Sequence, residues 1–200
     1  MVSRELTSAG LEEFMALAQL FEEYRPKLLA MVRRRLDPAL APRIDPEDIL
    51  SETYLIAHRK WSGFQEAPTV SPYAWLYGIA RECLIMAWRK HTRDGRDVHA
   101  AIPWPDASSV QMGFNLVGHE ASPSENFARE ELGDRMRQAL AVLKDSDREI
   151  LWMRHFDKLT FPEAGAILGI PENTATLRYV RALKRLETVW LQRNPADGPK

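Results

Sequence analysis

Four basic side chains stand close together near the C-terminus of this chain, at Arg178, Arg181, Lys184 and Arg185. Cations at this spacing on a helix can neutralise the phosphates of nucleic acid. Polar side chains that can reach base edges in a DNA groove come just before them: Glu172, Asn173, Thr174 and Thr176. A surface helix that only faces water would have a similar composition. The assignment therefore depends on the elements that surround these residues.

The segment around the cations contains start and stop signals for three helices. Ser146 and Glu149 have the spacing of a capping box, and so do Thr160 and Glu163. Gly169 stands where a helix often ends in a left-handed residue. We expect one helix that ends near Asp157–Lys158, a short helix that begins at Thr160, and a long helix from Glu172 to about Leu191. This order is typical of a helix-turn-helix, whose last helix enters the major groove of DNA.

The last of these helices has two different faces. Apolar residues recur at helical spacing and predict the packed face: Leu177, Val180, Leu183 and Leu186. The four cations fall largely on the other side, where we expect them to bind phosphate. The first turns, at 172–176, would reach the base edges.

The composition sets limits on the class of protein. The chain has 200 residues, of which 45% are hydrophobic and 28% charged, so it can form ordinary cores in one or two domains. Its net charge is −1, and any affinity for DNA must therefore come from local patches. The N-terminus lacks the apolar core of a signal peptide and no apolar run approaches membrane-spanning length, so we expect a cytoplasmic protein. Cys83 is the single cysteine and is expected to be a small core residue.

A second helical unit precedes the DNA-binding candidate. A helix over Leu11–Leu36 is expected, with a break or kink at Pro26. A second helix, capped by Asp45, should run to about Trp61. After a loop at 62–70, Ser71 should cap a long helix over Tyr73–Arg93, which ends in cations. Its buried stripe is predicted to comprise Leu76, Ile79, Ala80, Cys83, Leu84 and Ala87.

The two units are separated by a change in composition. Positions 98–121 are rich in Pro, Gly and Ser and have no sustained period, which predicts a flexible linker. Ser122 and Pro123 then form a cap and first-turn pair for a helix that ends near Leu143. The sequence therefore predicts an all-α protein with helical domains at 11–97 and 122–193.

Three segments, in this order, resemble the sigma-70 family of RNA polymerase sigma factors, of the small extracytoplasmic-function (ECF) type. Positions 45–54 resemble the family's region 2.2, and positions 72–81 resemble the helix that carries regions 2.3 and 2.4. Positions 143–151 and 169–174 resemble region 4, which contains the helix-turn-helix. The resemblance implies a region 2-like helical bundle followed by a region 4-like domain.

This resemblance implies a protein that binds core RNA polymerase, recognises the promoter minus-ten and minus-thirty-five elements and promotes DNA melting. It implies no catalytic residue, metal or cofactor, and no membrane span; an anti-sigma factor is a further candidate partner. The residues implied to bind core polymerase are Asp45, Glu47, Asp48 and Glu52. Those implied to bind the minus-ten element are Phe64, Arg81, Trp88, Arg89, Lys90 and Arg93. Those implied to bind the minus-thirty-five element are Glu172, Asn173, Thr174, Thr176, Arg178, Arg181, Lys184 and Arg185.

Other interpretations stay open at this point. Asp45 and Asp48 could serve only as helix caps, and Trp75 could serve only as a core residue. A stand-alone helix-turn-helix regulator is an alternative, although it has no need of the acidic helix or of the cationic helix that follows it. A metal-dependent enzyme would have to use scattered histidines, with no His-Glu-x-x-His pair among them: His58, His91, His99, His119 and His155.

Overall fold

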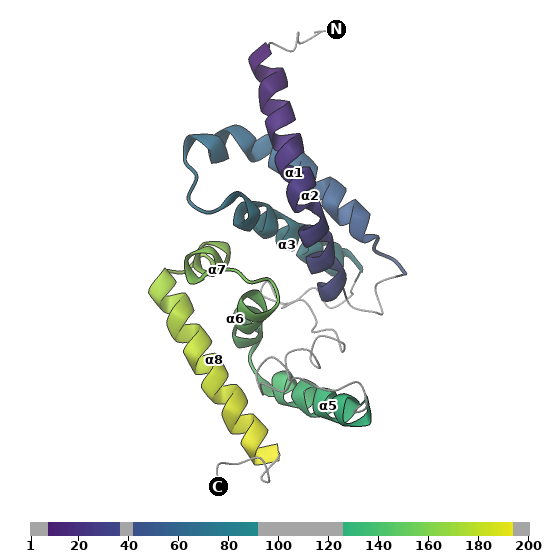
Figure 1. Cartoon of the computed structure of the whole chain (residues 1–200), viewed down its shortest axis with the longest axis vertical. Coiled ribbons are helices and arrows are strands. Elements are labelled where there is room, and N and C mark those ends of the chain that lie inside the picture. The colour runs from purple at the N-terminus through teal and green to yellow at the C-terminus, as the bar shows by residue number, and fades with distance from the viewer. Residues whose placement is uncertain (1–7, 37–41, 92–125, 194–200) are drawn as a thin grey trace.

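The computed structural model of this protein describes residues 8–36, 42–91 and 126–193. Within those ranges every regular element is an α-helix, and the helices form two groups (Figure 1). The N-terminal group comprises α1 (Ser8–Arg35), α2 (Pro46–Glu66) and α3 (Pro72–His91). The C-terminal group comprises α5 (Asn126–Val142), α6 (Asp145–His155), α7 (Phe161–Leu168) and α8 (Glu172–Arg193).

The prediction of an all-α protein with two helical domains is confirmed by this arrangement. The predicted linker at 98–121 and the predicted helix start at Ser122 lie outside the described residues. The domain bounds 11–97 and 122–193 therefore stay predictions.

Helix α1 runs through Pro26 without a break, and a kink there stays a prediction. Large apolar side chains of α1 are at most 5% exposed and pack into the core: Leu17, Phe21, Leu28, Met31 and Val32. Each contributes about 1.5–3 kcal/mol when fully buried, whereas a proline inside a helix costs about 3 kcal/mol. The packing of the whole helix therefore outweighs the lost backbone hydrogen bond.

Helix α2 begins where the sequence predicts and ends later. The Asp45 carboxylate accepts a hydrogen bond from the Glu47 N–H at 2.9 Å, which is the expected N-cap. The helix continues past the predicted end at Trp61 as far as Glu66. The Phe64 ring stacks on Trp75 of α3, with ring centroids 4.4 Å apart. This packing supports the last turn, which the sequence had placed in a loop.

Helix α3 follows the prediction closely in its described part. Ser71 caps it, since its Oγ accepts a hydrogen bond from the Ala74 N–H at 3.2 Å. The predicted stripe is buried at Leu76, Ile79, Ala80, Cys83 and Leu84, all at most 5% exposed, while Ala87 is half-buried. Position 93, the predicted end of this helix, lies outside the described residues.

Helix α6 begins differently from the prediction. Ser146 does not cap it, because the helix starts at Asp145 with Lys144 in the N-cap position and without a side-chain cap. The proposed partner in that capping box, Glu149, is 7% exposed and turns instead toward the N-terminal group. The predicted capping box at Ser146 is therefore wrong, because Glu149 has stronger, cationic partners elsewhere.

The turn between α7 and α8 is built as the sequence predicts. Thr160 and Glu163 form a complete capping box, and Gly169 ends α7 in the left-handed conformation with φ 65°. Gly165 has a separate role, because a Cβ atom there would lie 2.8 Å from the Ile170 carbonyl oxygen. These local features set the angle between the two helices.

The two groups of helices meet at a buried polar cluster. We call it the interdomain cluster; it consists of Arg35, Tyr77, Arg81, Glu149 and Asp157. Figure 1 shows α7 lying beside α3. Arg35 of α1 binds Glu149 at 2.8 Å and Asp157 at 3.1 Å. Both carboxylates also bind α3: the Tyr77 hydroxyl donates to Asp157 at 2.7 Å and the Arg81 Nε to Glu149 at 2.9 Å.

Candidate nucleic-acid interface and polymerase surface

Helix α8 packs against the C-terminal group through small and aromatic residues. Ala175, Ala182 and Leu186 are at most 3% exposed. Tyr179 is half-buried, and its hydroxyl lies 3.1 Å from the His155 Nε2 of α6. The small alanines allow the helix to approach its neighbours closely. The N-terminal half of α8 is thereby packed on α7 and α6.

The opposite face of α8 is exposed and carries two apolar side chains. Leu177 is 54% and Val180 43% exposed, so the prediction that they belong to the packed face is wrong. They share this face with Asn173 and Lys184, because spacings of three and four residues bring side chains to one side of a helix. Asn173, Thr174 and Lys184 are all exposed. The face therefore combines polar, apolar and cationic groups.

The cations predicted on α8 differ in their surroundings. Arg181 and Lys184 are exposed. Arg178 is half-buried, and Arg185 forms an ion pair with the buried Asp147 at the start of α6. Among the polar residues of the first turns, Glu172 is exposed, whereas Thr176 donates its hydroxyl to the Glu172 carbonyl at 3.1 Å. Arg181 and Lys184 are thus the cations placed best for phosphate.

The acidic start of α2 forms a second candidate surface. Asp48 and Glu52 are exposed, and Glu52 lies 3.8 Å from Arg59. Asp45 is occupied as the helix cap, and Glu47 forms an ion pair with Arg25 of α1 at 2.8 Å. Asp48 and Glu52 are therefore the exposed acids of this group that neither cap α2 nor pair with another helix.

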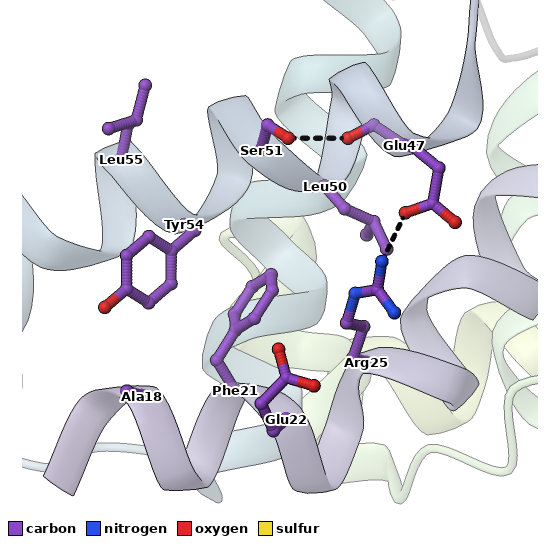
Figure 2. A pocket seen from close by; sticks show the side chains of 9 residues that line it. All are labelled: Ala18, Phe21, Glu22, Arg25, Glu47, Leu50, Ser51, Tyr54 and Leu55. Atoms are coloured by element: carbon purple, nitrogen blue, oxygen red, sulfur yellow. Dashed lines mark hydrogen bonds and ion pairs between the residues drawn. The ribbon is translucent and has the colours of Figure 1, made fainter. Parts of the chain in front are cut away.

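A pocket of about 470 Å³ opens between α1 and α2 beside these acids. Figure 2 shows the Phe21 and Tyr54 rings within it and the Arg25–Glu47 ion pair at one side. The residues that line it are Ala18, Phe21, Glu22, Arg25, Glu47, Leu50, Ser51, Tyr54 and Leu55. Leu55 is 55% exposed, so the acidic surface borders an apolar one.

The predicted minus-ten residues fall into three groups. Phe64 stacks on Trp75, inside an aromatic cluster that also contains Trp61. Arg81 is bound to Glu149 in the interdomain cluster. Toward the end of α3, Trp88 and Arg89 are half-buried and Lys90 is exposed, while Arg93 lies outside the described residues. Phe64 and Arg81 therefore have partners elsewhere and lie apart from the end of α3, where Trp88, Arg89 and Lys90 follow one another.

Known families match both groups of helices. The family model described as sigma-70 region 2 matches residues 20–94, and the one described as sigma-70, region 4, matches residues 133–186. The chain is 31% identical over 160 residues to the ECF RNA polymerase sigma factor SigF of Caulobacter vibrioides (strain NA1000 / CB15N). The match covers 80% of this chain and 77% of that relative. The chain belongs to the sigma-70 family.

Further relatives are also ECF sigma factors. SigW of Bacillus subtilis (strain 168) is 26% identical over 172 residues, which cover 86% of this sigma factor and 87% of SigW. A solved structure of the sigma factor RpoE of Bartonella quintana, in complex with the anti-sigma factor NepR, aligns with a TM-score of 0.50 and 21% identity. It covers 88% of this chain and 94% of that chain, and shows a shared fold. The sigma-factor interpretation of the sequence is confirmed, and these matches do not favour a stand-alone regulator.

The interdomain cluster of this sigma factor joins the two parts of the chain that match the family models. Arg35, Tyr77 and Arg81 belong to the part that matches region 2, and Glu149 and Asp157 to the part that matches region 4. The sequence did not single out Arg35, Tyr77 or Asp157 as site residues. Asp157 lies two residues after the end of α6, where the sequence alone indicates only an ordinary polar residue beyond a helix. Its partners come from helices far away in the sequence.

Burial and neighbouring charge shift the pKa values in the cluster. Burial, the largest effect on Glu149, would raise its pKa, but Arg35 and Arg81 outweigh it and lower the pKa to about 2. Burial would lower the pKa of Arg35, whereas Glu149, Tyr77 and Asp157 together raise it. Burial raises the pKa of the Tyr77 hydroxyl well above its usual value. At neutral pH the cluster therefore holds charged Arg35 and Glu149 beside a protonated Tyr77.

The part of the chain that the structure describes contains no group of three or more His, Cys, Asp or Glu side chains that could hold a metal ion. No described helix is long and apolar enough to cross a membrane. His155 serves as a packing residue, since its ring stacks on Tyr179 with centroids 5.8 Å apart. Burial, then Lys158 and Arg154, lower its pKa.

Proposed function

We propose that this sigma factor binds core RNA polymerase, directs it to promoters that carry minus-ten and minus-thirty-five elements, and promotes melting of the DNA there. In the cytoplasm it selects the promoter and promotes melting, while the polymerase catalyses RNA synthesis. The observation that carries the proposal is the pairing, in one chain, of a region 2-like bundle with a region 4-like domain that exposes a cationic α8 face.

Core binding is assigned to the exposed acids of α2. Asp48 and Glu52 point away from the bundle, and the apolar pocket beside them can receive a side chain of the partner. A basic, partly apolar surface of the polymerase would complement both features. Asp45 and Glu47 act mainly by shaping this end of α2, through the cap and the ion pair with Arg25.

Reading of the minus-thirty-five element is assigned to α8. Asn173 and Thr174 stand on its exposed first turn, where a recognition helix reaches base edges. Arg181 and Lys184 follow on the same exposed side and would bind phosphates. Arg178 and Arg185 would fix the helix on the duplex from its flank.

Reading of the minus-ten element is assigned to the C-terminal part of α3. Trp88, Arg89 and Lys90 offer an aromatic ring beside cations, a combination that suits single-stranded DNA. Arg93 would extend this surface. Phe64 contributes indirectly, because it stacks on Trp75 and holds the loop that precedes α3.

The structural relative from Bartonella quintana was solved with an anti-sigma factor. We infer that a protein of this kind regulates the present chain as well. Two DNA-binding units held on one polymerase gain affinity through effective concentration, so each alone can bind weakly. A regulator that blocks either unit would therefore silence the whole chain.

Run-off transcription tests this proposal. Bacterial core polymerase, a promoter library and the purified chain should give transcripts from defined sites only when the chain is present. The double variant Asp48→Lys/Glu52→Lys should fail to form the holoenzyme, whereas Glu187→Lys, an exposed acid on α8, should assemble normally. Absence of both transcripts and a complex with cognate core polymerase would overturn the proposal and favour a stand-alone regulator.

A further inference from the structure

Helix α8 turns one side away from the rest of its domain. Its packed side contains Ala175 and Ala182, which are both fully buried. An α-helix advances about 100° for each residue, so Leu177 and Val180 lie roughly 140–160° around the helix from both alanines. Spacings of three and four residues bring four side chains into one stripe, which we call the outward face: Asn173, Leu177, Val180 and Lys184.

The centre of the outward face is apolar and does not contribute to folding. Leu177 is 54% and Val180 43% exposed, and neither belongs to the side chains that pack on the hydrophobic core. The next apolar residue of α8, Leu183, does pack there. Single exposed apolar side chains are common on protein surfaces, whereas adjacent ones with a polar rim indicate a binding surface. The outward face is therefore suited to contact another molecule.

The polar groups around this apolar pair indicate that the other molecule is duplex DNA. Lys184 lies one turn beyond Val180, and Arg181 is exposed beside it, so both can bind phosphate. Asn173 is exposed one turn before Leu177, and its amide can pair with adenine in the major groove. An apolar protein surface would bury this cation and this amide without partners, at a cost in free energy. The charge and polarity of the outward face therefore complement DNA.

The apolar group that the major groove offers to such a side chain is the C5 methyl group of thymine. Leu177 is four residues beyond Asn173, which corresponds to about 6 Å along the helix axis. Successive base pairs are about 3.4 Å apart, so this distance spans about two base steps. Val180 lies about 4.5 Å further along the axis, toward the end of the face that binds phosphate. Leu177 is thus the apolar residue closer to the base edges.

The polar neighbours of Leu177 are less open to the groove. Thr176 donates its hydroxyl to the Glu172 carbonyl at 3.1 Å, so its one hydrogen-bond donor is used within the helix. Thr176, Arg178 and Tyr179 are half-buried, whereas Leu177 is exposed. In this turn of α8, Leu177 is therefore the side chain that a base edge would meet.

We propose that Leu177 is a specificity-determining residue, which reads a thymine methyl group in the minus-thirty-five element, with Val180 covering one side of the contact. This inference deepens the proposed function and rests on it, because it requires α8 to lie in the major groove of that element. The sigma factor then selects thymine at this position through an apolar contact. The thymine stands about two base steps from the base that Asn173 contacts.

Replacement of single thymines by deoxyuridine tests the contact, because uracil lacks the methyl group and keeps the hydrogen-bonding groups. Promoters are first selected by run-off transcription with the holoenzyme. Each thymine of the minus-thirty-five element, on either strand, is then replaced in turn, and the affinity of the holoenzyme for the duplex is measured. At one position the replacement should weaken binding about fourfold, as expected for one buried methyl group. Equal affinity at every position, or an element without thymine, would overturn the proposal.

Variants connect this effect to Leu177. Leu177→Ala should bind thymine and uracil duplexes equally, at about the affinity that the wild type has for the uracil duplex. Leu177→Met keeps an apolar side chain of similar volume and should keep the preference for thymine. Met15→Ala is the matched control, because it removes an apolar side chain of α1 that is 50% exposed, and it should leave the preference unchanged. A Leu177→Ala chain that still prefers thymine fourfold would overturn the role of Leu177.

The same experiments distinguish the methyl contact from the proposed function. If the holoenzyme initiates at defined promoters and none of their thymines is sensitive, the methyl contact is refuted and the proposed function stands. If no promoter is selected and the chain does not bind core polymerase, the proposed function fails and the methyl contact falls with it. If Leu177→Ala/Val180→Ala lowers the affinity for core polymerase and leaves DNA binding unchanged, the outward face binds protein, and the methyl contact is refuted.

Discussion

The Nε of Arg81 on α3 donates to the Glu149 carboxylate on α6 at 2.9 Å, across the boundary between two domains that separately match sigma regions 2 and 4. The same carboxylate oxygen accepts a hydrogen bond from Arg35 of α1 at 2.8 Å. One acid of the C-terminal domain therefore holds two helices of the N-terminal domain. The charge state of Glu149 consequently influences both stability and domain arrangement.

Acid should weaken the contact between the two domains through Glu149. The pKa of this carboxyl is lowered from 4.5 to about 2, so its contribution is full above pH 4.5 and is lost as the pH falls from 4.5 toward 2. This shift corresponds to on the order of 3 kcal/mol at neutral pH. We expect Glu149→Gln to lower the urea midpoint clearly at pH 7, and this difference from the wild type to shrink as the pH falls below 4.5. A difference that stays constant between pH 7 and pH 3 would contradict it.

The exposed cations of α8 should determine the salt dependence of promoter binding. Arg181→Gln and Lys184→Gln should each reduce the slope of log affinity against log salt by about 0.9, because each removes one phosphate contact. The measurement is the affinity of the holoenzyme for a duplex promoter over a series of salt concentrations. Arg33→Gln, an exposed cation on α1, serves as the matched control and should leave the slope unchanged.

The apolar residues on the exposed face of α8 should affect binding and leave stability alone. Leu177→Ala and Val180→Ala remove side chains that are 54% and 43% exposed, so we expect changes in unfolding free energy within about 0.5 kcal/mol. Both should also weaken promoter binding, because an apolar side chain on this face can contact a thymine methyl group and alanine is too short to reach it. Leu186→Ala, on the packed face, should instead cost about 2–5 kcal/mol. Urea titration and binding to minus-thirty-five variants separate the two effects.

Gly165→Ala should disturb the turn that aims α8. The new Cβ would lie 2.8 Å from the Ile170 carbonyl oxygen, a distance that backbone atoms cannot accept without a shift. We expect a loss of about 1–3 kcal/mol in stability of the C-terminal domain, together with weaker binding of the minus-thirty-five element. Gly63→Ala is the control, because a Cβ atom there would meet open space on α2. Equal stability of the two variants would show that the turn can yield.

The sequence predicted best those features that depend on residues within one helical turn. The caps at Asp45 and Thr160 and the left-handed Gly169 involve neighbouring residues only, and all three are present. Pro26 does not break its helix, because packing along the whole of α1 outweighs the cost of a proline there. Leu177 and Val180 were misjudged because apolar spacing alone does not tell a packed face from a binding face.

The sequence could single out Arg81 as a candidate site residue, but it could not identify the partner of Arg81 in the fold. Arg81 has the type and place of a DNA-binding residue, but its partner Glu149 is 68 residues away in the sequence. No local pattern links them, and Glu149 also fitted a capping box that does not form. Long-range pairs of this kind become visible only when the two domains are seen together.

The burial of Arg35 limits how domains can be exchanged between related sigma factors. Its two carboxylate partners both come from the C-terminal domain. A chimera that joins residues 8–91 to the region 4 domain of another sigma factor would keep the guanidinium and lose its counter-charges unless acids stood at the equivalents of Glu149 and Asp157. The two domains of this chain are therefore matched to each other, and a graft that preserves each fold can still leave a buried guanidinium without its counter-charges.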